Sequence, residues 1–485
     1  MTAFLLVLIP LLSMPVAFVL PIRQRRILPL ATAVINLVLI IQAPKAISGS
    51  NTSWLVIDAT GYLFMILTAL LFLAASVSLL PYLKTHAAPG QSGSFLPTRL
   101  RPSRETVFIA NLLFFLASMN MVCVSNNFGL LWIAIEMTTL SSAPLVYFHK
   151  SASSLEATWK YLLTCSIGIA LALLGNFFLA SSMPYSANHE LSLFFSDVLS
   201  QAGSLNHSWL AAAMICFVVG YGTKMGLAPM HSWLPDAHSE SPALVSALMS
   251  GALLNCAWLG ILRGYAVCVA AGQQSFVAHL FIGFGLFSML FAAAFIVGQR
   301  DYKRLLAYSS VENMGIIALA TGLGGGYVAM LHTVYHSLTK GMLFLTSGRI
   351  LEHTGTKKTA SVRGLIISSP LTGLLWLLGI IAITGAPPFG PFFSEFMIFN
   401  LGLQAGHYWI TAAYAVLLTT IFAGFFAVGL PMVQGEPLSK SLKPVSLISA
   451  LPPLILLISV AILGVWLPAP IKQSIEAAAR QVGIL

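Results

Sequence analysis

Apolar runs long enough to cross a membrane recur along almost the whole chain. One crossing needs about 20 apolar residues. We count fourteen such runs, centred near residues 12, 36, 70, 114, 137, 168, 218, 254, 287, 313, 338, 376, 418 and 456. Only 8% of the 485 residues are charged, whereas soluble domains carry about 25%. The sequence therefore predicts an all-α polytopic membrane protein with about fourteen transmembrane helices.

The distribution of basic residues predicts how these helices are oriented. When successive connections are assigned to alternate sides, 18 of the 24 Lys and Arg residues fall on one side and four on the other, while Lys224 and Lys340 lie within spans. Cytoplasmic loops carry such an excess of positive charge. We expect a multi-pass protein of the cell inner membrane with both termini on the periplasmic side. The net charge of +10 then reflects topology, and no nucleic-acid partner is expected.

Ionisable residues interrupt four of the apolar runs. Lys224 lies in VVGYGTKMGLAP, Glu136 in GLLWIAIEMTTLSSAPL, and Glu312 and Glu395 in later runs. A charge at the bilayer centre costs a few kcal/mol even on lenient scales. Glu136 and Lys224 are therefore either a static buried ion pair or an acid–base pair that moves protons, because a buried lysine loses its proton more readily when its counter-charge leaves. The residues alone leave both alternatives open.

A second polar group follows one helical stripe. His332, His336 and Lys340, in MLHTVYHSLTKGMLF, are spaced i, i+4, i+8 and share one face of a helix. Histidine both donates and accepts protons near neutral pH, so the stripe predicts a proton relay. The alternatives are core histidines bonded to carbonyls and a metal site. No third metal ligand lies nearby in sequence, and we expect no metal.

Two proline-rich interruptions suggest that the chain contains two related halves. GLAPMHSWLP follows Lys224, and GAPPFGPFFS precedes Glu395. Proline removes a backbone donor and clashes with the preceding turn, so both spans are predicted to be broken helices, as in transport sites built from repeats. We divide the chain into an N-terminal three-helix segment (1–83), repeats at 105–265 and 276–433, and a C-terminal helix and tail (446–485). The loop from Lys84 to Arg104 forms the clearest boundary.

Other polar residues have less specific expectations. His231 and His238, in PMHSWLPDAHSESPA, either admit protons from the cytoplasm or belong to a solvated turn. Asp58 is expected to cap or anchor the third span, and Arg263 to snorkel to the surface. The five cysteines form no CxxC or Cys/His ligand spacing, and the sequence has no GxGxxG, P-loop or GxSxG motif. We expect no cofactor and no catalytic residue, so any redox centres would belong to another subunit.

Four segments resemble a known family. GYGTKMGLAPMHSWLPDAHSESPALVSALMSG, DYKRLLAYSSVENMG, HTVYHSLTKGMLF and TGAPPFGPFFSEF are similar to the antiporter-like subunits of respiratory complex I, Mrp-type cation/proton antiporters and group 4 [NiFe] hydrogenases. The resemblance covers about residues 55–430. It implies fourteen helices with two inverted five-helix repeats, a proton path along the mid-plane of the membrane, and partners consisting of other membrane-arm subunits and a peripheral redox arm.

The resemblance also implies roles for individual residues. Glu136 and Lys224 correspond to the family's glutamate–lysine pair, His332, His336 and Lys340 to its eleventh-span relay, and Glu395 to its twelfth-span terminal residue. Two departures, Asn255 where GxLLK has a lysine and Glu312–Asn313 where many relatives have a histidine, are similar to the component F type of hydrogenase-4 and formate hydrogenlyase. Asparagine carries no proton charge, so Asn255 is a candidate gap in the path.

These observations lead to an expected function with alternatives. We expect a proton-translocating subunit of a redox-driven complex of the group 4 hydrogenase type, in which Glu312 and Glu395 load and release protons in turn. The alternatives are an Mrp-type cation/proton antiporter subunit or a complex I subunit, a scaffold that no longer pumps because of Asn255, and a small-molecule transporter. The sequence contains no specific binding constellation for the last of these.

Overall fold

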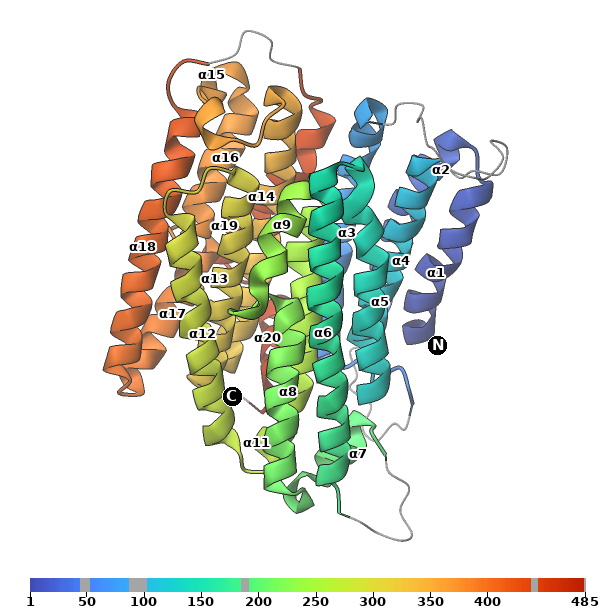
Figure 1. Cartoon of the computed structure of the whole chain (residues 1–485), viewed down its shortest axis with the longest axis vertical. Coiled ribbons are helices and arrows are strands. Elements are labelled where there is room, and N and C mark those ends of the chain that lie inside the picture. Colours follow the sequence, from blue (N-terminus) through green and yellow to red (C-terminus); the bar gives the residue numbers. More distant parts are fainter. Residues whose placement is uncertain (44–52, 87–102, 185–191, 438–443, 484–485) are drawn as a thin grey trace.

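The computed structural model describes residues 1–43, 53–86, 103–184, 192–437 and 444–483 as a bundle of helices (Figure 1). The α-helices are α1 (Thr2–Val19), α2 (Ile22–Gln42), α3 (Ala59–His86), α4 (Arg104–Val124), α5 (Phe128–Val146), α6 (Ala152–Ser182), α7 (Phe195–Ser200), α8 (His207–Met225), α9 (Trp233–Glu240), α10 (Ala243–Leu248), α11 (Leu254–Ala270), α12 (Gln274–Ile296), α13 (Tyr302–Gly322), α14 (Gly326–Thr354), α15 (Leu365–Ser368), α16 (Pro370–Ile383), α17 (Gly390–Gln404), α18 (Tyr408–Val433), α19 (Leu451–Val465) and α20 (Ala469–Gln481). The 3₁₀ segments are η2 (Tyr147–His149), η3 (Ala202–Ser204), η4 (Met230–Ser232), η6 (Thr359–Ser361) and η7 (Ile448–Ala450), and η5 (Met249–Leu253) is a π-helix.

The prediction of an all-α multi-pass membrane protein is confirmed. Within the described ranges the only extended pairings are three isolated β-bridges. Eleven helical segments of this part of the chain are long and apolar enough to cross a membrane. In a bilayer core every backbone group must be satisfied inside the protein, which favours helices. The predicted boundary loop at 84–104 lies mostly outside the described residues.

Helix α14 forms the centre of the bundle. It contacts α3, α10, α13, α16, α17, α19 and α20, and almost every residue from Gly326 to Ile350 is buried. The segment Ala243–Ala270, which includes α10, η5 and α11, is equally enclosed. The histidines and lysine of α14 are therefore held in the protein interior and do not face lipid.

Both predicted helix breaks are present. Helix α8 ends at Met225, and Gly226, with φ of 87°, turns the chain before η4 and α9. The amides of Gly226 and Leu227 both donate to the Gly222 carbonyl at 2.9 Å, which satisfies the end of the helix. Helices α16 and α17 are likewise separated by residues 384–389. Two further irregularities were not predicted: the break at Ser241–Pro242 and the π-helix η5.

The expectation that Arg263 snorkels to the surface is wrong. Arg263 is 4% exposed, forms an ion pair with Asp58, and lies 4.6 Å from the centroid of the Phe195 ring. Asp58 anchors the third span as expected, because its Oδ1 accepts the Gly61 amide at 2.7 Å. Its Oδ2 also accepts from Gln481 Nε2 at 2.8 Å. A carboxylate inside the fold thus replaces water as the partner of Arg263. The ion pair joins α11 to the beginning of α3, and the Gln481 hydrogen bond to the same carboxylate joins α20.

We predict that Asp58→Asn lowers the free energy of unfolding by about 3 kcal/mol, because it leaves the buried Arg263 charge uncompensated. Denaturant titration of the purified full chain in detergent micelles measures this. Glu156→Gln is the matched control, because Glu156 pairs with Lys160 on the exposed surface and such pairs contribute at most about 1 kcal/mol. Equal losses in the two variants would contradict the structural role of the Asp58–Arg263 pair.

Candidate functional site

Lys224 is completely buried in the last turn of α8. Its Nζ donates to the Tyr161 hydroxyl at 2.5 Å and to Thr139 Oγ1 at 2.8 Å, and it lies 4.6 Å from the centroid of the Tyr161 ring. The half-buried Glu136 accepts from the Thr139 hydroxyl at 3.1 Å and from Ser166 Oγ at 3.2 Å. The structure thus brings Glu136 and Lys224 to one site, where the Thr139 hydroxyl bridges them.

Helix geometry and small residues create this site. Glu136 and Thr139 are three residues apart and share one face of α5. Helices α6 and α8 approach closely at two glycines. A Cβ on Gly168 would lie 2.7 Å from Thr223 Cβ, and one on Gly220 would lie 2.6 Å from the Ala172 amide nitrogen. This close packing brings Tyr161 of α6 within reach of Lys224 of α8.

Asn255, which is buried in α11, is joined to α14 by a hydrogen bond. Its Nδ2 donates to the Gly251 carbonyl at 2.8 Å and to Ser337 Oγ of α14 at 2.7 Å, but its Oδ1 has no described partner. The described side chains do not connect Lys224 to Asn255 by hydrogen bonds. Tyr221 OH and Trp258 Nε1 are also buried without described partners. Buried polar groups of this kind are usually satisfied by ordered water.

The stripe on α14 makes three separate sets of contacts, and all its members are fully buried. Lys340 Nζ donates to the Leu306 carbonyl at 2.9 Å and also contacts Ser309 Oγ. His336 Nε2 lies 3.3 Å from the Ser250 carbonyl in the π-helix, while its Nδ1 has no described partner. The two residues therefore link α14 to α13 and to η5, respectively.

His332 connects three helices. Its Nε2 lies 3.1 Å from Asn313 Oδ1 on α13, and its Nδ1 lies 2.9 Å from Ser394 Oγ on α17. The Asn313 amide nitrogen donates to the Ser309 carbonyl at 2.7 Å, which leaves its oxygen to accept from His332. Nε2 therefore carries a hydrogen. Ser394 has one hydroxyl hydrogen to give either to His332 Nδ1 or to the Pro391 carbonyl at 3.0 Å.

The two late carboxylates occupy different environments. Glu312 is 2% exposed, and its Oε2 has no described partner. Glu395 follows Ser394 directly and lines an open cavity of about 370 Å³ together with Gly385, Phe392, Phe396 and Tyr414. The structure therefore places Glu395 next to the His332 contact and beside a space that opens to the protein surface.

The polar interior offers hydrogen-bonding groups and no converging metal ligands. In the described part of the chain, no three His, Cys, Asp or Glu side chains come together as a metal site. The ring nitrogens of His332 and His336 contact different partners on different elements. The five cysteines carry free thiols. The arrangement is suited to holding and passing protons between hydroxyl, amide, imidazole, amine and carboxyl groups.

A family profile described as NADH:quinone oxidoreductase/Mrp antiporter, TM, matches residues 125–422. The chain belongs to this family. It is 40% identical over 331 residues to a hydrogenase-4 component F homolog of Methylacidiphilum infernorum (isolate V4), with 67% of this chain and 69% of the relative covered. It is 30% identical over 389 residues to NADH-quinone oxidoreductase subunit N of Desulforudis audaxviator (strain MP104C), with 78% and 73% covered.

Solved structures share the fold of this antiporter-like subunit. A chain of the membrane-bound sulfane sulfur reductase, an archaeal respiratory membrane complex, superimposes with a TM-score of 0.84, covering 99% of this chain and 97% of that chain at 20% identity. The family match contains every polar residue from Glu136 to Glu395 described above, whereas Asp58 and α20 lie outside it. The expected resemblance to antiporter-like membrane subunits is therefore confirmed.

Both histidines in the link after Lys224 of this antiporter-like subunit are buried, so the solvated-turn alternative is wrong for them. His238 belongs to α9, is fully buried, and stacks on Phe344 with ring centroids 4.8 Å apart. Neither of its ring nitrogens has a described partner. His231 is 6% exposed and packs against the Phe291 and Tyr308 rings. No local sequence pattern indicated that this link would pack inside the helix bundle.

Sequence reasoning missed Lys303, which it counted among the ordinary basic loop residues. Lys303 is 1% exposed, and its Nζ donates to the carbonyls of Ser241 at 2.5 Å and Ser239 at 3.2 Å. Lys357 Nζ binds Glu240 Oε1 at 2.5 Å beside it. The available signal was Pro242: proline after Ser241 interrupts the helix and frees carbonyl groups that a cation can use.

We predict that Gly385→Ala destabilises the subunit more than Gly406→Ala. Both glycines have positive φ, 65° and 74°, so each substitution costs about 1–2 kcal/mol of backbone strain. A Cβ at Gly385 would also lie 1.9 Å from Glu395 Oε2, whereas Gly406 has nothing within 4 Å. The added Cβ would displace the flexible end of the Glu395 side chain beside its cavity, which should cost about 1 kcal/mol more, the low end of the overpacking range. Thermal unfolding of the two variants checks this, and equal melting temperatures would contradict the close contact between Gly385 and Glu395.

Proposed function

We propose that this antiporter-like subunit translocates protons in a redox-driven membrane complex of the group 4 [NiFe] hydrogenase or formate hydrogenlyase type. The observation that carries the proposal is the buried row of proton-exchanging groups, from the Glu136–Thr139–Lys224 cluster to the His332–Ser394 contact beside Glu395. Similarity to the hydrogenase-4 component F homolog supports this type of complex. Other membrane-arm subunits and a peripheral redox arm would be its partners.

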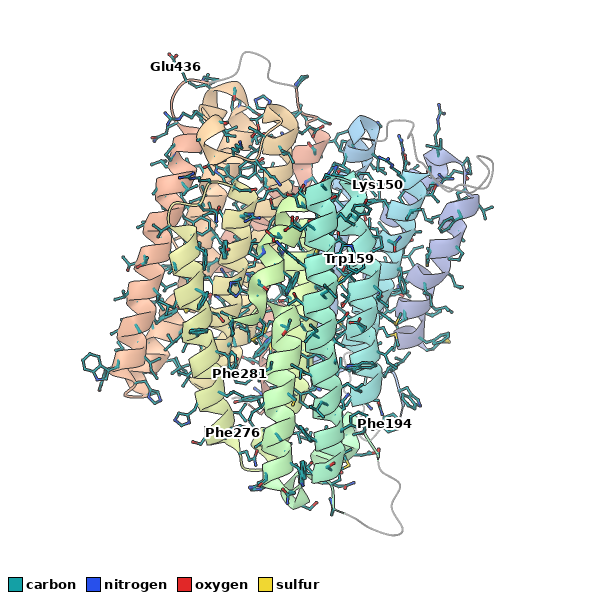
Figure 2. All side chains as sticks on the ribbon, in the orientation of Figure 1. Lys150, Trp159, Phe194, Phe276, Phe281 and Glu436 are labelled. Atoms are coloured by element: carbon teal, nitrogen blue, oxygen red, sulfur yellow. The ribbon has the colours of Figure 1, made fainter. Side chains whose placement is uncertain are left out.

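The proposed membrane arrangement has fourteen spans and two inverted five-helix repeats at 105–265 and 276–433. The eleven apolar segments, together with α13, α14 and the broken α16–α17 pair, make fourteen. Each proposed repeat contains one broken helix. The N-terminus and α20 lie in the lower half of Figure 1, whereas Lys150 lies in the upper half of Figure 2. This supports termini on the periplasmic side of the inner membrane and a basic end in the cytoplasm.

In the proposed mechanism, Thr139 couples Glu136 to Lys224. The Thr139 hydroxyl has one hydrogen, which it donates to Glu136 while its oxygen accepts from Lys224. When a charge change in a neighbouring subunit draws Glu136 away, the hydroxyl is free to rotate and Lys224 loses its electrostatic compensation. Burial then favours the neutral amine, and the proton leaves Lys224 for the second half.

The transfer to α14 requires water at Asn255. The unpartnered polar atoms of Asn255 and Tyr221 supply the sites that such water needs. Protons would then reach His336, Lys340 and His332, and Glu312 and Glu395 would load and release in turn. Protonation of His332 at Nδ1 requires the Ser394 hydrogen to turn towards the Pro391 carbonyl. His231 and His238 are the proposed route of proton uptake from the cytoplasm.

The energy demand is compatible with this electrostatic mechanism. Moving one charge through 100 mV costs about 2.3 kcal/mol, and a shift of one pKa unit corresponds to about 1.4 kcal/mol. A pKa shift of about two units at one buried lysine therefore corresponds to a free energy similar to that needed to move one proton across the membrane.

We predict that Lys224→Ala abolishes proton pumping while the redox activity of the complex is retained. Proton uptake per turnover in inverted vesicles containing the whole complex measures this. Lys472→Ala, which changes an exposed lysine of α20, is the control and should pump normally. Unchanged pumping in Lys224→Ala would favour the scaffold alternative. Translocation that requires Na⁺ and proceeds without redox turnover would favour the Mrp-type alternative.

The bridging role of Thr139 gives a separate prediction. Thr139→Val keeps the side-chain volume but removes the hydroxyl, and should slow proton pumping at least about tenfold, because a hydrogen bond to a charged group contributes roughly 1.5–3 kcal/mol. Thr68→Val is the matched control, since the buried Thr68 hydroxyl bonds only to the Phe64 carbonyl of its own helix. Equal pumping rates in the two variants would exclude Thr139 from the coupling path.

A further inference from the structure

A large cavity lies at the basic end of the bundle, and none of the residues assigned to the proton path lines it. Its volume is about 730 Å³, within the range of small-molecule sites. The walls come from the end of α3, the break between α9 and α10, the beginning of α13 and the end of α14. His149, next to Lys150, also lines it, which places the cavity in the upper half of Figure 2.

The cavity wall carries an excess of positive charge. Six basic side chains line it against three carboxylates, those of Glu240, Asp301 and Glu352, which leaves a surplus of three positive charges. The basic residues are Arg300, Lys303, Arg304, Arg349, Lys357 and Lys358. Glu240 and Asp301 already engage Lys357, and Arg304 pairs with Asp236. The carboxylates thus compensate only part of the positive charge.

Four of these cations have no carboxylate within 4 Å among the described residues: Arg300, Lys303, Arg349 and Lys358. Two of the four are buried. Lys303 is 1% exposed and bonds only to carbonyls, and Arg349 is 4% exposed and bonds to Thr372, Ser449 and the Ser446 carbonyl. Burying a charge without a counter-charge is costly, so a cavity walled by such cations is suited to an anion.

The rest of the wall is apolar. Leu244, Leu345 and Leu351 line the same cavity as the cations. A small inorganic anion would use only the charged part of the wall, whereas an amphiphile would fill both parts. The cytoplasmic leaflet is rich in anionic lipids, and basic pockets between helices on that side bind their headgroups.

From these observations we infer that the cavity binds the phosphate headgroup of an anionic phospholipid, with the lipid phosphate between Arg300, Lys358 and the buried Lys303, and the glycerol and upper acyl region against the leucine wall. None of the residues assigned to the proton path lines this cavity, although His238 of the proposed uptake route directly precedes Ser239 in its wall. The choice of the cytoplasmic leaflet rests on the proposed orientation of the subunit, whereas the binding itself does not require pumping.

The test uses the whole complex in nanodiscs of phosphatidylcholine that contain increasing fractions of phosphatidylglycerol bearing a photoreactive group near its headgroup. Labelling of the segments 299–304 and 349–358 is quantified by mass spectrometry. Arg300→Gln/Lys358→Gln should weaken the apparent affinity about thirtyfold, since each basic residue contributes about 1 kcal/mol to anionic-lipid attraction. Both residues are exposed, so the change should leave the melting temperature of the complex unaltered.

Arg23→Gln/Arg363→Gln is the charge-matched control, because both arginines are exposed and lie outside the cavity wall. Unchanged labelling in this control, together with loss in the cavity variant, supports the site. Equal labelling in the two variants overturns the proposal. Competition by unlabelled phosphatidylcholine that is as effective as competition by unlabelled phosphatidylglycerol also overturns it. If potassium phosphate displaces the photoreactive lipid and potassium chloride at equal ionic strength does not, the cavity binds soluble phosphate. That result would overturn the proposal of a lipid ligand.

Discussion

The cost of holding a charge away from water is the constraint on which the rest of this structure depends. Each buried cation offsets this desolvation cost with a different set of partners. Arg263 has the Asp58 carboxylate, Lys224 has two hydroxyl groups, and Lys340 has a carbonyl and a hydroxyl. Lys303 uses two carbonyls beside the break at Pro242. The Asp58–Arg263 pair thus has full charge compensation, whereas the buried Lys224, Lys303 and Lys340 have only neutral partners within hydrogen-bonding distance.

This difference separates anchoring from proton transfer. A carboxylate that accepts a direct ion pair fixes its partner in the charged state, and Asp58 fastens Arg263 and α20 in this way. A hydroxyl partner leaves the charge of a lysine dependent on groups further away. Thr139, Ser394 and Asn313 hold Lys224 and His332 in place with hydrogen bonds that can reverse. The helix breaks and the π-helix supply the backbone groups that make such an interior possible.

Much of the fold could be predicted from the sequence because each helix that crosses a membrane requires a long apolar run. Apolar runs indicated the helices, and the prolines after Lys224 and before Glu395 indicated the two breaks. The i, i+4, i+8 spacing placed His332, His336 and Lys340 on one stripe. Contacts across helices were not predictable. Arg263 was expected at the surface because no local partner is visible, and its true partner, Asp58, is 205 positions earlier.

The sequence by itself determined the class of protein, the breaks and the residue types available for proton exchange, because hydropathy, proline chemistry and helical periodicity are local properties. Only the tertiary structure decided that Thr139 stands between Glu136 and Lys224, that α9 buries His238, and that unpaired cations surround one cavity. These features depend on how closely helices approach, as at Gly168 and Gly220. Such distances follow from the packing of the whole bundle, which no local pattern specifies.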